Sequence, residues 1–253
     1  MRVAGLREAL AGRGLQVIDR GNLNGPSNPW QQPVDGYRHL AEVTQWNHLV
    51  HDAVHGTLQQ GHLPILLGGD HSVTYPILRA IGPLHPKLSV LHIDAHADLY
   101  DEFEGDRYSH ACPFARVMEE NLVNQLVQVG IRTLTGHQKE QAERFGVEII
   151  DMRAWADGAR PSIAGPVYVS LDLDGLDPAF APGVSHREPG GLSVRDVLNV
   201  IFALNGPIVG ADIVEYNPVQ DLGGMTAQVA AKFVKELSGL MRRGPSHSLA
   251  GLP

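Results

Sequence analysis

Asp94, His96 and Asp98 stand two residues apart, directly behind an apolar run of the chain. Successive side chains of an extended chain point to opposite faces, so these three are expected to project in the same direction. Carboxylate and imidazole groups are common ligands of divalent cations in proteins. The spacing therefore predicts one part of a metal site.

Three other segments carry similar chemistry. Residues 68–72 read Gly-Gly-Asp-His-Ser, residues 172–177 read Asp-Leu-Asp-Gly-Leu-Asp, and Glu215 follows another apolar run. Carboxylates packed together repel one another and raise each other's pKa unless a cation lies among them. A bound metal would resolve that repulsion, and its candidate ligands are His71, Asp94, His96, Asp98, Asp172 and Asp174.

The number and type of these ligands limit the choice of metal. Four carboxylates and two imidazoles are more than one tetrahedral zinc ion usually takes, and the imidazoles do not suit calcium. The set suits two hard or borderline ions such as Mn²⁺, bridged by carboxylates. Two ions roughly 3.5 to 4 Å apart can activate water toward an electrophilic carbon. Hydrolysis is therefore the expected class of reaction.

Isolated polar residues have simpler interpretations. Asp70, Asp177 and Asp221 are each expected to cap a helix or stabilise a turn. A single histidine usually lies on the surface or is satisfied within the core. We take that as the default for His39, His48, His51, His55, His62, His85, His137, His186 and His247.

Short apolar runs alternate with longer amphipathic segments, and this pattern predicts the elements that position the candidate ligands. Strands are expected at residues 15–19, 63–67, 88–93, 126–131, 147–150, 167–171 and 208–214. Helices are expected at residues 3–11, 38–61, 72–81, 109–120, 138–145, 194–204 and 226–242, and a loop at 21–36. Continuous apolar strands separated by helices indicate a parallel sheet covered on both faces, which binds ligands at the carboxyl ends of its strands.

Composition limits the class of protein. The 253 residues, 43% of them hydrophobic, suit one α/β domain over residues 1–253 with a frayed tail at 244–253. The formal charge of −8 and the lack of basic clusters argue against nucleic acid as a partner. The single Cys112 excludes an intramolecular disulfide and a zinc site built from cysteines. No apolar run is long enough to span a bilayer or form a signal-peptide core, so we expect a soluble cytoplasmic protein without a membrane partner.

Four segments together resemble the signatures of the ureohydrolase (arginase/agmatinase) family. They are residues 68–72, 94–98 (Asp-Ala-His-Ala-Asp), 170–178 (Ser-Leu-Asp-Leu-Asp-Gly-Leu-Asp-Pro) and 214–218 (Val-Glu-Tyr-Asn-Pro), in the family's order. The resemblance extends from about Ala4 to Arg242. It implies a three-layer α/β/α fold with a mainly parallel sheet of about eight strands. It also implies a centre of two Mn²⁺ ions that cleaves a guanidino group into urea and an amine.

The resemblance also implies a role for each candidate ligand. Asp94 and Asp172 match the family's bridging carboxylates, which are shared by both ions. By the same resemblance, His71 and Asp98 complete the ligands of one ion, and His96 and Asp174 complete those of the other.

Two further residues match catalytic positions of the family. His110 matches an active-site histidine that shuttles protons or acts as a general acid, although a helix-capping histidine is the alternative. Glu215 matches the carboxylate that pairs with the guanidinium group of the substrate. Asp98 is a second candidate for delivering a proton to the leaving amine. Ser109, His110 and Cys112 could suggest nucleophilic catalysis, but no third orienting group is visible.

The substrate is less well defined than the metal site. Partners that hold the α-amino and α-carboxyl groups of arginine in animal-type arginases are missing from residues 99–109 and 133–138. Residues 103–110 and 181–193 look closer to plant-type arginases, which resemble agmatinases more than animal enzymes. Arginine and agmatine therefore both remain open, as do another guanidino or formimino compound and a non-catalytic scaffold of the same fold. The far end of the substrate is expected to meet Tyr100 and Asp101, with Glu102, Asp106 and Arg107 as further candidates, unless this loop is only a solvated acidic segment.

Two expectations concern the whole molecule. Family members usually begin with a strand and a glycine-rich turn ahead of the helix that starts here near Val3, and neither is evident. Loss of an inner strand exposes backbone groups and apolar surface, so we expect a truncated form or a rearranged sheet. The resemblance further implies a homo-oligomer, either a trimer or a hexamer.

Overall fold

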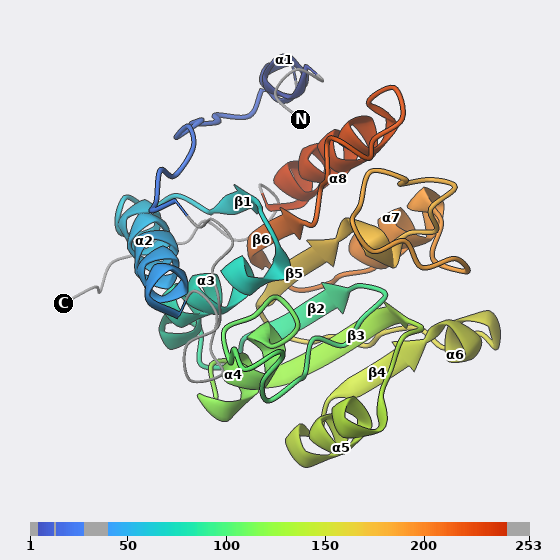
Figure 1. The fold of residues 1–253 in the computed structure, drawn as a ribbon. Helices are drawn as coiled ribbons and strands as arrows, with labels where there is room; N and C mark the ends of the chain where they lie inside the picture. The colour runs from blue at the N-terminus through green and yellow to red at the C-terminus, as the bar shows by residue number, and fades with distance from the viewer. Residues whose placement is uncertain (1–4, 13, 28–39, 242–253) are drawn as a thin grey trace.

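A six-stranded parallel sheet forms the centre of the protein (Figure 1). The computed structural model describes residues 5–12, 14–27 and 40–241. The strands lie in the order β1-β6-β5-β2-β3-β4, and every neighbouring pair is parallel. Their bounds are β1 Ile65–Leu67, β2 Ser89–Ile93, β3 Gln125–Ile131, β4 Glu148–Asp151, β5 Val167–Asp172 and β6 Ile208–Val214. The predicted three-layer α/β architecture with a mainly parallel sheet is confirmed.

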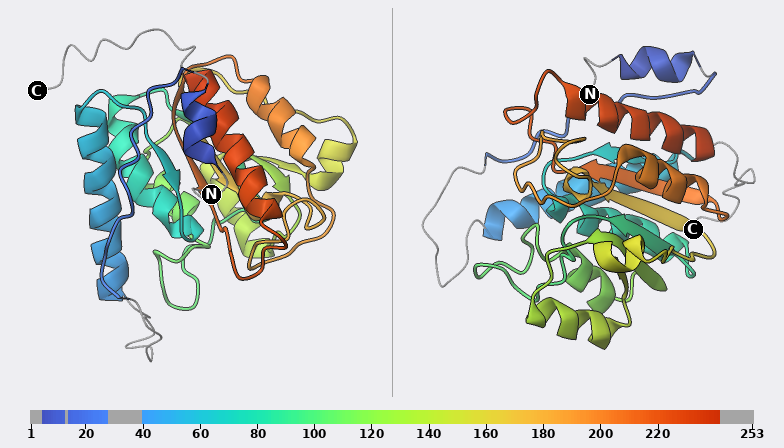
Figure 2. Two further views of the ribbon diagram at one scale, coloured as in Figure 1. Left: turned by 90° about the horizontal axis from the view of Figure 1, so that it is seen from above. Right: turned by 90° about the vertical axis from the view of Figure 1, so that its right-hand side faces the viewer.

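Helices cover both faces of the sheet (Figure 2). One face packs against α2 (Leu40–Gln59), α3 (Thr74–Ile81), α4 (Pro113–Glu119) and α5 (Gly136–Phe145). The other packs against α1 (Leu6–Ala11), α6 (Met152–Ala156), α7 (Val194–Phe202) and α8 (Met225–Met241). Short 3₁₀ turns η2 (His71–Val73), η3 (Gly82–Leu84) and η4 (Leu173–Gly175) complete the described elements.

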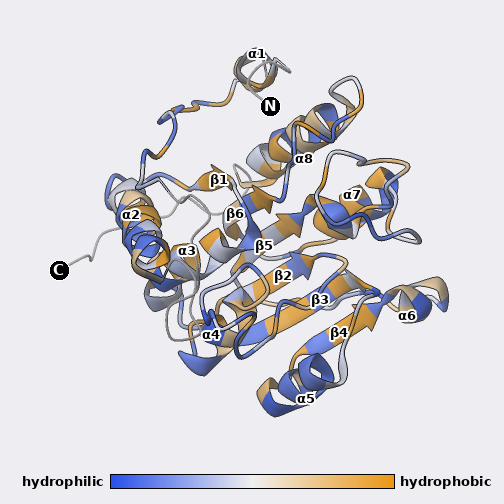
Figure 3. Ribbon diagram, viewed as in Figure 1, coloured by the Kyte–Doolittle hydropathy of each residue, from blue (hydrophilic) through white to orange (hydrophobic). Residues whose placement is uncertain are grey.

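The burial of the central strands follows from their sequences. Every residue of β2, β5 and β6 is buried, which is the reason why these strands read as almost continuous apolar runs. Along β2, Leu91 and Ile93 join the core beneath α7 and α8, whereas Val90 joins the core beneath α3 and α4. Figure 3 shows the hydrophobic residues concentrated on the strands, while the outer helix α5 is largely polar. The strands therefore form a rigid base for the loops at their carboxyl ends.

Most predicted elements lie within a few residues of the observed ones, but the strand predicted at residues 15–19 is wrong. This segment has no regular secondary structure, and the side chains of Val17 and Ile18 are 50% and 60% exposed. Its β-branched residues favour an extended chain, but no described strand of the sheet pairs with it. The sheet accordingly has six strands within the described ranges, fewer than the eight implied by the family resemblance.

Smaller differences occur at helix ends. The helix predicted from Ser109 begins at Pro113, since proline suits the first helical position and residues 109–112 form a turn. The helix α6 was not predicted because its five residues are too few to show helical periodicity. The predicted frayed tail at 244–253, and most of the predicted loop at 21–36, lie outside the described residues. No described helix has the length and apolar character needed to cross a membrane.

Candidate metal centre

The carboxyl ends of four neighbouring strands bring the candidate ligands together. Strands β1, β6, β5 and β2 are adjacent, so the turns that follow them lie along one edge of the sheet. Ile93 of β2 is paired with Leu171 of β5, which places the next residues, Asp94 and Asp172, at the same level. The sheet thus gathers residues that are up to 103 positions apart, from His71 to Asp174.

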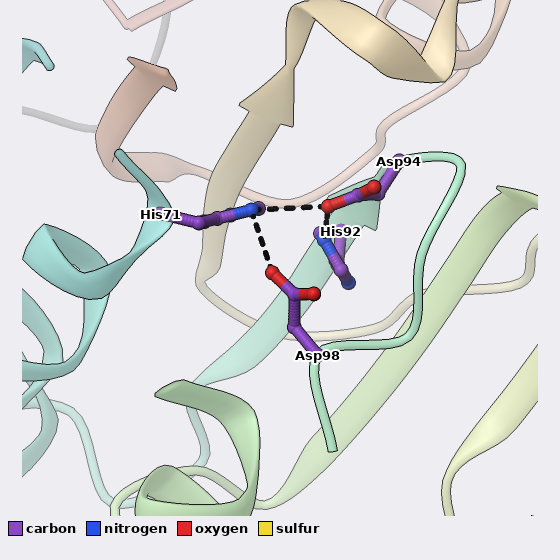
Figure 4. Close-up of side chains that lie close together, drawn as sticks. All are labelled: His71, His92, Asp94 and Asp98. Carbon is purple, nitrogen blue, oxygen red and sulfur yellow. Dashed lines mark hydrogen bonds and ion pairs between the residues drawn. The ribbon is translucent and has the colours of Figure 1, made fainter. Parts of the chain in front are cut away.

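His71 lies at the centre of a first group of carboxylates. Its Nδ1 atom is 3.0 Å from Asp94 Oδ2, 3.1 Å from Asp98 Oδ2 and 3.2 Å from Asp172 Oδ2. All four side chains are buried. Figure 4 shows Asp94 and Asp98, which both follow β2, directed toward His71 from another segment of the chain.

His96 lies at the centre of a second group. Its Nδ1 atom is 3.3 Å from Asp94 Oδ1 and 3.2 Å from Asp174 Oδ2. Asp94 therefore belongs to both groups, with one carboxylate oxygen facing each imidazole. The second carboxylate predicted as a bridge, Asp172, directs Oδ2 toward His71, while its Oδ1 accepts the backbone N–H of Asp174 at 2.7 Å.

Crowding of these groups shifts their pKa values. Burial and the charges of Asp174 and Asp94 raise the pKa of Asp172 well above its usual range. Burial and Asp94 raise the pKa of Asp174 to about 6. Burial opposes ionisation of Asp94, but its contacts with His92, His71 and His96 outweigh burial and hold its pKa well below the usual range. Without a metal, the folded site therefore retains protons on several of its groups.

The residues present fit a divalent cation. His71 Nδ1 is buried and makes no hydrogen bond of acceptable geometry, although three carboxylate oxygens lie within 3.2 Å of it. An unpaired polar atom at such a place is costly unless an ion or another partner satisfies it. The surrounding ligand atoms are oxygen and imidazole nitrogen, which suit Mn²⁺ and similar ions.

Backbone conformation at two site residues is strained. Asp98 and Glu215 have φ values of 50° and 62°, in the left-handed region that residues other than glycine rarely adopt. Strain of this kind often marks functional sites, because the surrounding structure has to hold it in place. It turns the chain so that Asp98 can face His71 and Glu215 can reach the His71 backbone.

Glu215 and His110, the two catalytic candidates beyond the ligand set, lie near the metal-site groups. Glu215 Oε1 accepts the backbone N–H of His71 at 2.9 Å, and burial together with the charge of Asp70 raises the pKa of Glu215 to about 8. The half-buried ring of His110 stacks on His186, with ring centres 5.9 Å apart. These placements are compatible with the predicted roles, which stay predictions.

Three residues near the site were not predicted as part of it. His92 Nε2 lies 2.8 Å from Asp94 Oδ2, and Gln128 Nε2 donates to His92 Nδ1 at 3.0 Å, so a buried amide and imidazole support Asp94. The default interpretation of His186 is a surface histidine or one satisfied within the core, but its ring lies 6.0 Å from that of His96. His92 directly precedes the Asp94 motif by two residues on the same strand face, a signal that could have revealed it.

The predicted substrate loop has its own contacts. The Asp101 carboxylate pairs with Arg107 and Arg116, each at 3.0 Å. The ring of Tyr100 stacks on His137 with ring centres 5.7 Å apart. The prediction that Tyr100 and Asp101 contact the substrate is not tested by these contacts, but Asp101 already has cationic partners.

The three aspartates that were expected to cap helices or stabilise turns accept backbone N–H groups. Asp70 accepts the backbone N–H of Ser72, Asp177 accepts those of Ala179, Gly190 and Gly191, and Asp221 accepts those of Thr226 and Ala227. Cys112 is buried, and burial raises the pKa of its thiol to about 12. A thiol held protonated in this way is a poor nucleophile.

Gly175 permits the close approach of two site segments, which leads to a stability prediction. A Cβ atom at Gly175 would lie 2.8 Å from the backbone nitrogen of Asp94 and 3.0 Å from its Cα atom. We expect Gly175→Ala to reduce the free energy of unfolding by about 1–3 kcal/mol, because backbone atoms have to move apart. Urea denaturation measures this change.

Gly136→Ala is the matched control, since nothing lies within 4 Å of a Cβ atom at that position of α5. This variant should be as stable as the wild type or slightly more stable. Equal stability of the two variants would contradict the importance of the close approach.

Comparisons with known proteins agree with the geometry of the site. A sequence model described as the Arginase family matches residues 2–239. Mitochondrial arginase 1 of Arabidopsis thaliana is 52% identical over 185 residues, which cover 69% of this chain and 54% of that protein. Guanidinopropionase of Pseudomonas aeruginosa is 38% identical over 231 residues, which cover 85% of this chain and 70% of that protein.

A solved structure extends the similarity to the fold. The arginase from Bacillus caldovelox aligns with a TM-score of 0.81 and 26% identity, covering 94% of this chain and 90% of that one. The chain spans only about half the length of the Arabidopsis relative. Because the family model matches almost all residues of this chain, the chain belongs to the arginase family.

Proposed function

We propose that this protein is a binuclear manganese hydrolase that cleaves the guanidino group of arginine or agmatine into urea and an amine. The observation that carries the proposal is the Asp94 carboxylate, whose two oxygens face two different groups of potential ligands. A shared carboxylate of this kind suits a pair of neighbouring metal ions. The names of the relatives, arginase and guanidinopropionase, support a guanidino compound as substrate.

The six candidate ligands would be divided between two cations. His71 and Asp98 would hold one ion, His96 and Asp174 the other, and the carboxylates of Asp94 and Asp172 would bridge both. Bound there, the ions would lower the pKa of water toward neutrality and so supply a nucleophile strong enough for the resonance-stabilised guanidinium carbon.

The remaining residues would bind the substrate and move protons. Glu215 would orient the guanidinium by charge-assisted hydrogen bonds, and the raised pKa of its buried carboxyl means that an incoming cation favours its ionisation. The leaving amine needs a proton, which Asp98 or His110 could deliver. At the other end of the substrate, Tyr100 is a better candidate than Asp101, whose carboxylate pairs with two arginines.

Three finer properties stay proposals, the first two drawn from the family resemblance and the third from the sequence. They are the identity of the metal as manganese, a trimeric or hexameric assembly and a cytoplasmic location. The nitrogen and oxygen ligand set supports the first of these.

Urea release tests the proposed function directly. The protein, purified and supplied with Mn²⁺, is incubated with arginine, agmatine, guanidinobutyrate, guanidinopropionate and formiminoglutamate, and urea is measured. We expect urea from arginine or agmatine at rates at least about 10³-fold above a metal-free sample. Turnover of formiminoglutamate alone, or no turnover of any compound by a protein that has bound Mn²⁺, would contradict the proposal.

A further inference from the structure

Asp212 is a buried acidic residue in the interior of the sheet, behind the candidate metal centre. It lies on β6, and its exposed fraction is 0%. In the described part of the chain its carboxylate makes no ion pair, and its partners are hydroxyl groups. Thr74 Oγ1 lies 2.8 Å and the Tyr168 hydroxyl 2.6 Å from Oδ2, while Ser170 Oγ lies 2.8 Å from Oδ1.

The direction of these hydrogen bonds follows from the chemistry of the groups. Each of the three hydroxyl groups donates its proton to a carboxylate oxygen of Asp212, which accepts it. Ser170 has a single hydroxyl proton, which is therefore used at Asp212 Oδ1. Its oxygen can then only accept in its 2.9 Å contact with His71 Nε2, so that nitrogen carries a proton.

This direction determines which nitrogen of His71 is free. In a neutral imidazole, a proton on Nε2 leaves a lone pair on Nδ1. Nδ1 is the atom that faces the carboxylates of Asp94, Asp98 and Asp172, and it is the atom that a metal would need as a ligand. Histidines that bind metals commonly donate their other N–H group to a partner that fixes the ring in this way.

We propose that Asp212 is a positioning residue for the metal centre, acting through Ser170 to fix the tautomer and orientation of His71. The inference rests on the proposed metal site and adds a residue that has no contact with it. Asp212 is separated from His71 by Ser170, and all three side chains are buried, so water does not compete for these hydrogen bonds. In such surroundings a chain of hydrogen bonds is stronger than in water.

Asp212→Asn tests the direction of the chain with almost no change in shape. An amide can donate to Ser170 Oγ, which frees the serine proton to point at His71 Nε2 and favours a proton on Nδ1. We expect Asp212→Asn to weaken binding of one Mn²⁺ ion by about 10- to 100-fold, with little effect on the ion held by His96. Competition between the protein and a fluorescent chelator measures both affinities, and the melting temperature checks the fold.

Tyr168→Phe is the matched control. It removes a buried hydroxyl that also donates to Asp212, but on Oδ2, the oxygen that does not contact Ser170. It should lower stability while leaving both Mn²⁺ affinities within about threefold of the wild type. Equal weakening of Mn²⁺ binding in Tyr168→Phe and Asp212→Asn would overturn the proposal, since it would mean that loss of stability alone explains the effect.

A double-mutant cycle with Ser170→Ala keeps the inference testable if Asp212→Asn folds poorly. If Asp212 acts through Ser170, then Asp212→Asn added to Ser170→Ala should cause no further loss of affinity. Unchanged Mn²⁺ binding in folded Ser170→Ala or folded Asp212→Asn would overturn it. Tight Mn²⁺ binding without urea release would contradict the proposed function but leave this inference standing, whereas a wild-type protein that binds no Mn²⁺ would overturn both.

Discussion

Asp94→Ala is expected to remove both metal ions and to reduce urea release by about 10³-fold or more. The two carboxylate oxygens of Asp94 face His71 and His96 at 3.0 and 3.3 Å. One substitution therefore removes a ligand from each group. His96→Ala should weaken mainly one ion, because the His71 group is not changed by it. Metal content per chain, measured by mass spectrometry after gel filtration in Mn²⁺, distinguishes the two variants.

Asp177→Ala is the control for the loss of a carboxylate near the same strand end. Asp177 accepts backbone N–H groups in a turn and belongs to neither ligand group, so this variant should lose some stability and retain both ions. If folded Asp94→Ala held as much metal as the wild type, its assignment as a bridge would be wrong.

The main parts of the site could be predicted from sequence because they follow strands. A buried parallel strand is recognisable as an apolar run, and its carboxyl end lies at the ligand-binding edge of the sheet. The spacing of Asp94, His96 and Asp98 then shows which side chains can converge. The structure brings them together with His71 and Asp174 as these patterns suggested.

Residues that act on the site through others could not be predicted in the same way. Asp212 is visible as one aspartate within the apolar strand 208–214, but its partners Thr74 and Ser170 come from distant segments. His186 lies between η4 and α7, far along the chain from His96, although the two rings are 6.0 Å apart. Such contacts depend on tertiary structure, and no local pattern encodes them.

The incorrect prediction of a strand at residues 15–19 has a similar origin. A β-branched pair at Val17 and Ile18 favours an extended conformation, but a strand also needs a neighbour with free backbone groups. Whether that neighbour exists depends on the whole sheet rather than on the segment itself. The segment remains extended and exposed beside the layers that were predicted correctly.

Removal of the metal should make the stability of the protein fall as pH rises from about 6.5 to 8. The pKa of Glu215 is raised to about 8 and that of His96 to about 12, and those of Asp172 and His71 are raised well above their usual ranges. In this window the unfolded chain has released protons that the folded, metal-free chain still holds. Because the unfolded state binds fewer protons, the free energy of unfolding decreases with pH.

Asp94, His92 and His186 have lowered pKa values, but they do not change the sign in this window. Asp94 is ionised in both states above pH 5. In the unfolded state His92 and His186 still hold part of a proton each near pH 6.5, but Glu215, Asp172, His71 and His96 hold more in the folded state. We therefore expect the melting temperature of the metal-free protein to drop by several degrees between pH 6.5 and 8. Differential scanning calorimetry after removal of metal with a chelator measures it.

Mn²⁺ should reverse this dependence, because metal ligands have to be deprotonated before they can bind. Calorimetric titration with Mn²⁺ in buffers of different ionisation enthalpy should then show protons released at pH 6.5. Asp94→Ala serves as the control, since a protein that no longer holds the ions should keep its decline in stability even with Mn²⁺ present. A metal-free melting temperature that stays constant or rises from pH 6.5 to 8 would mean that the crowded carboxylates are not protonated in the folded state, and that something other than a metal compensates their charge.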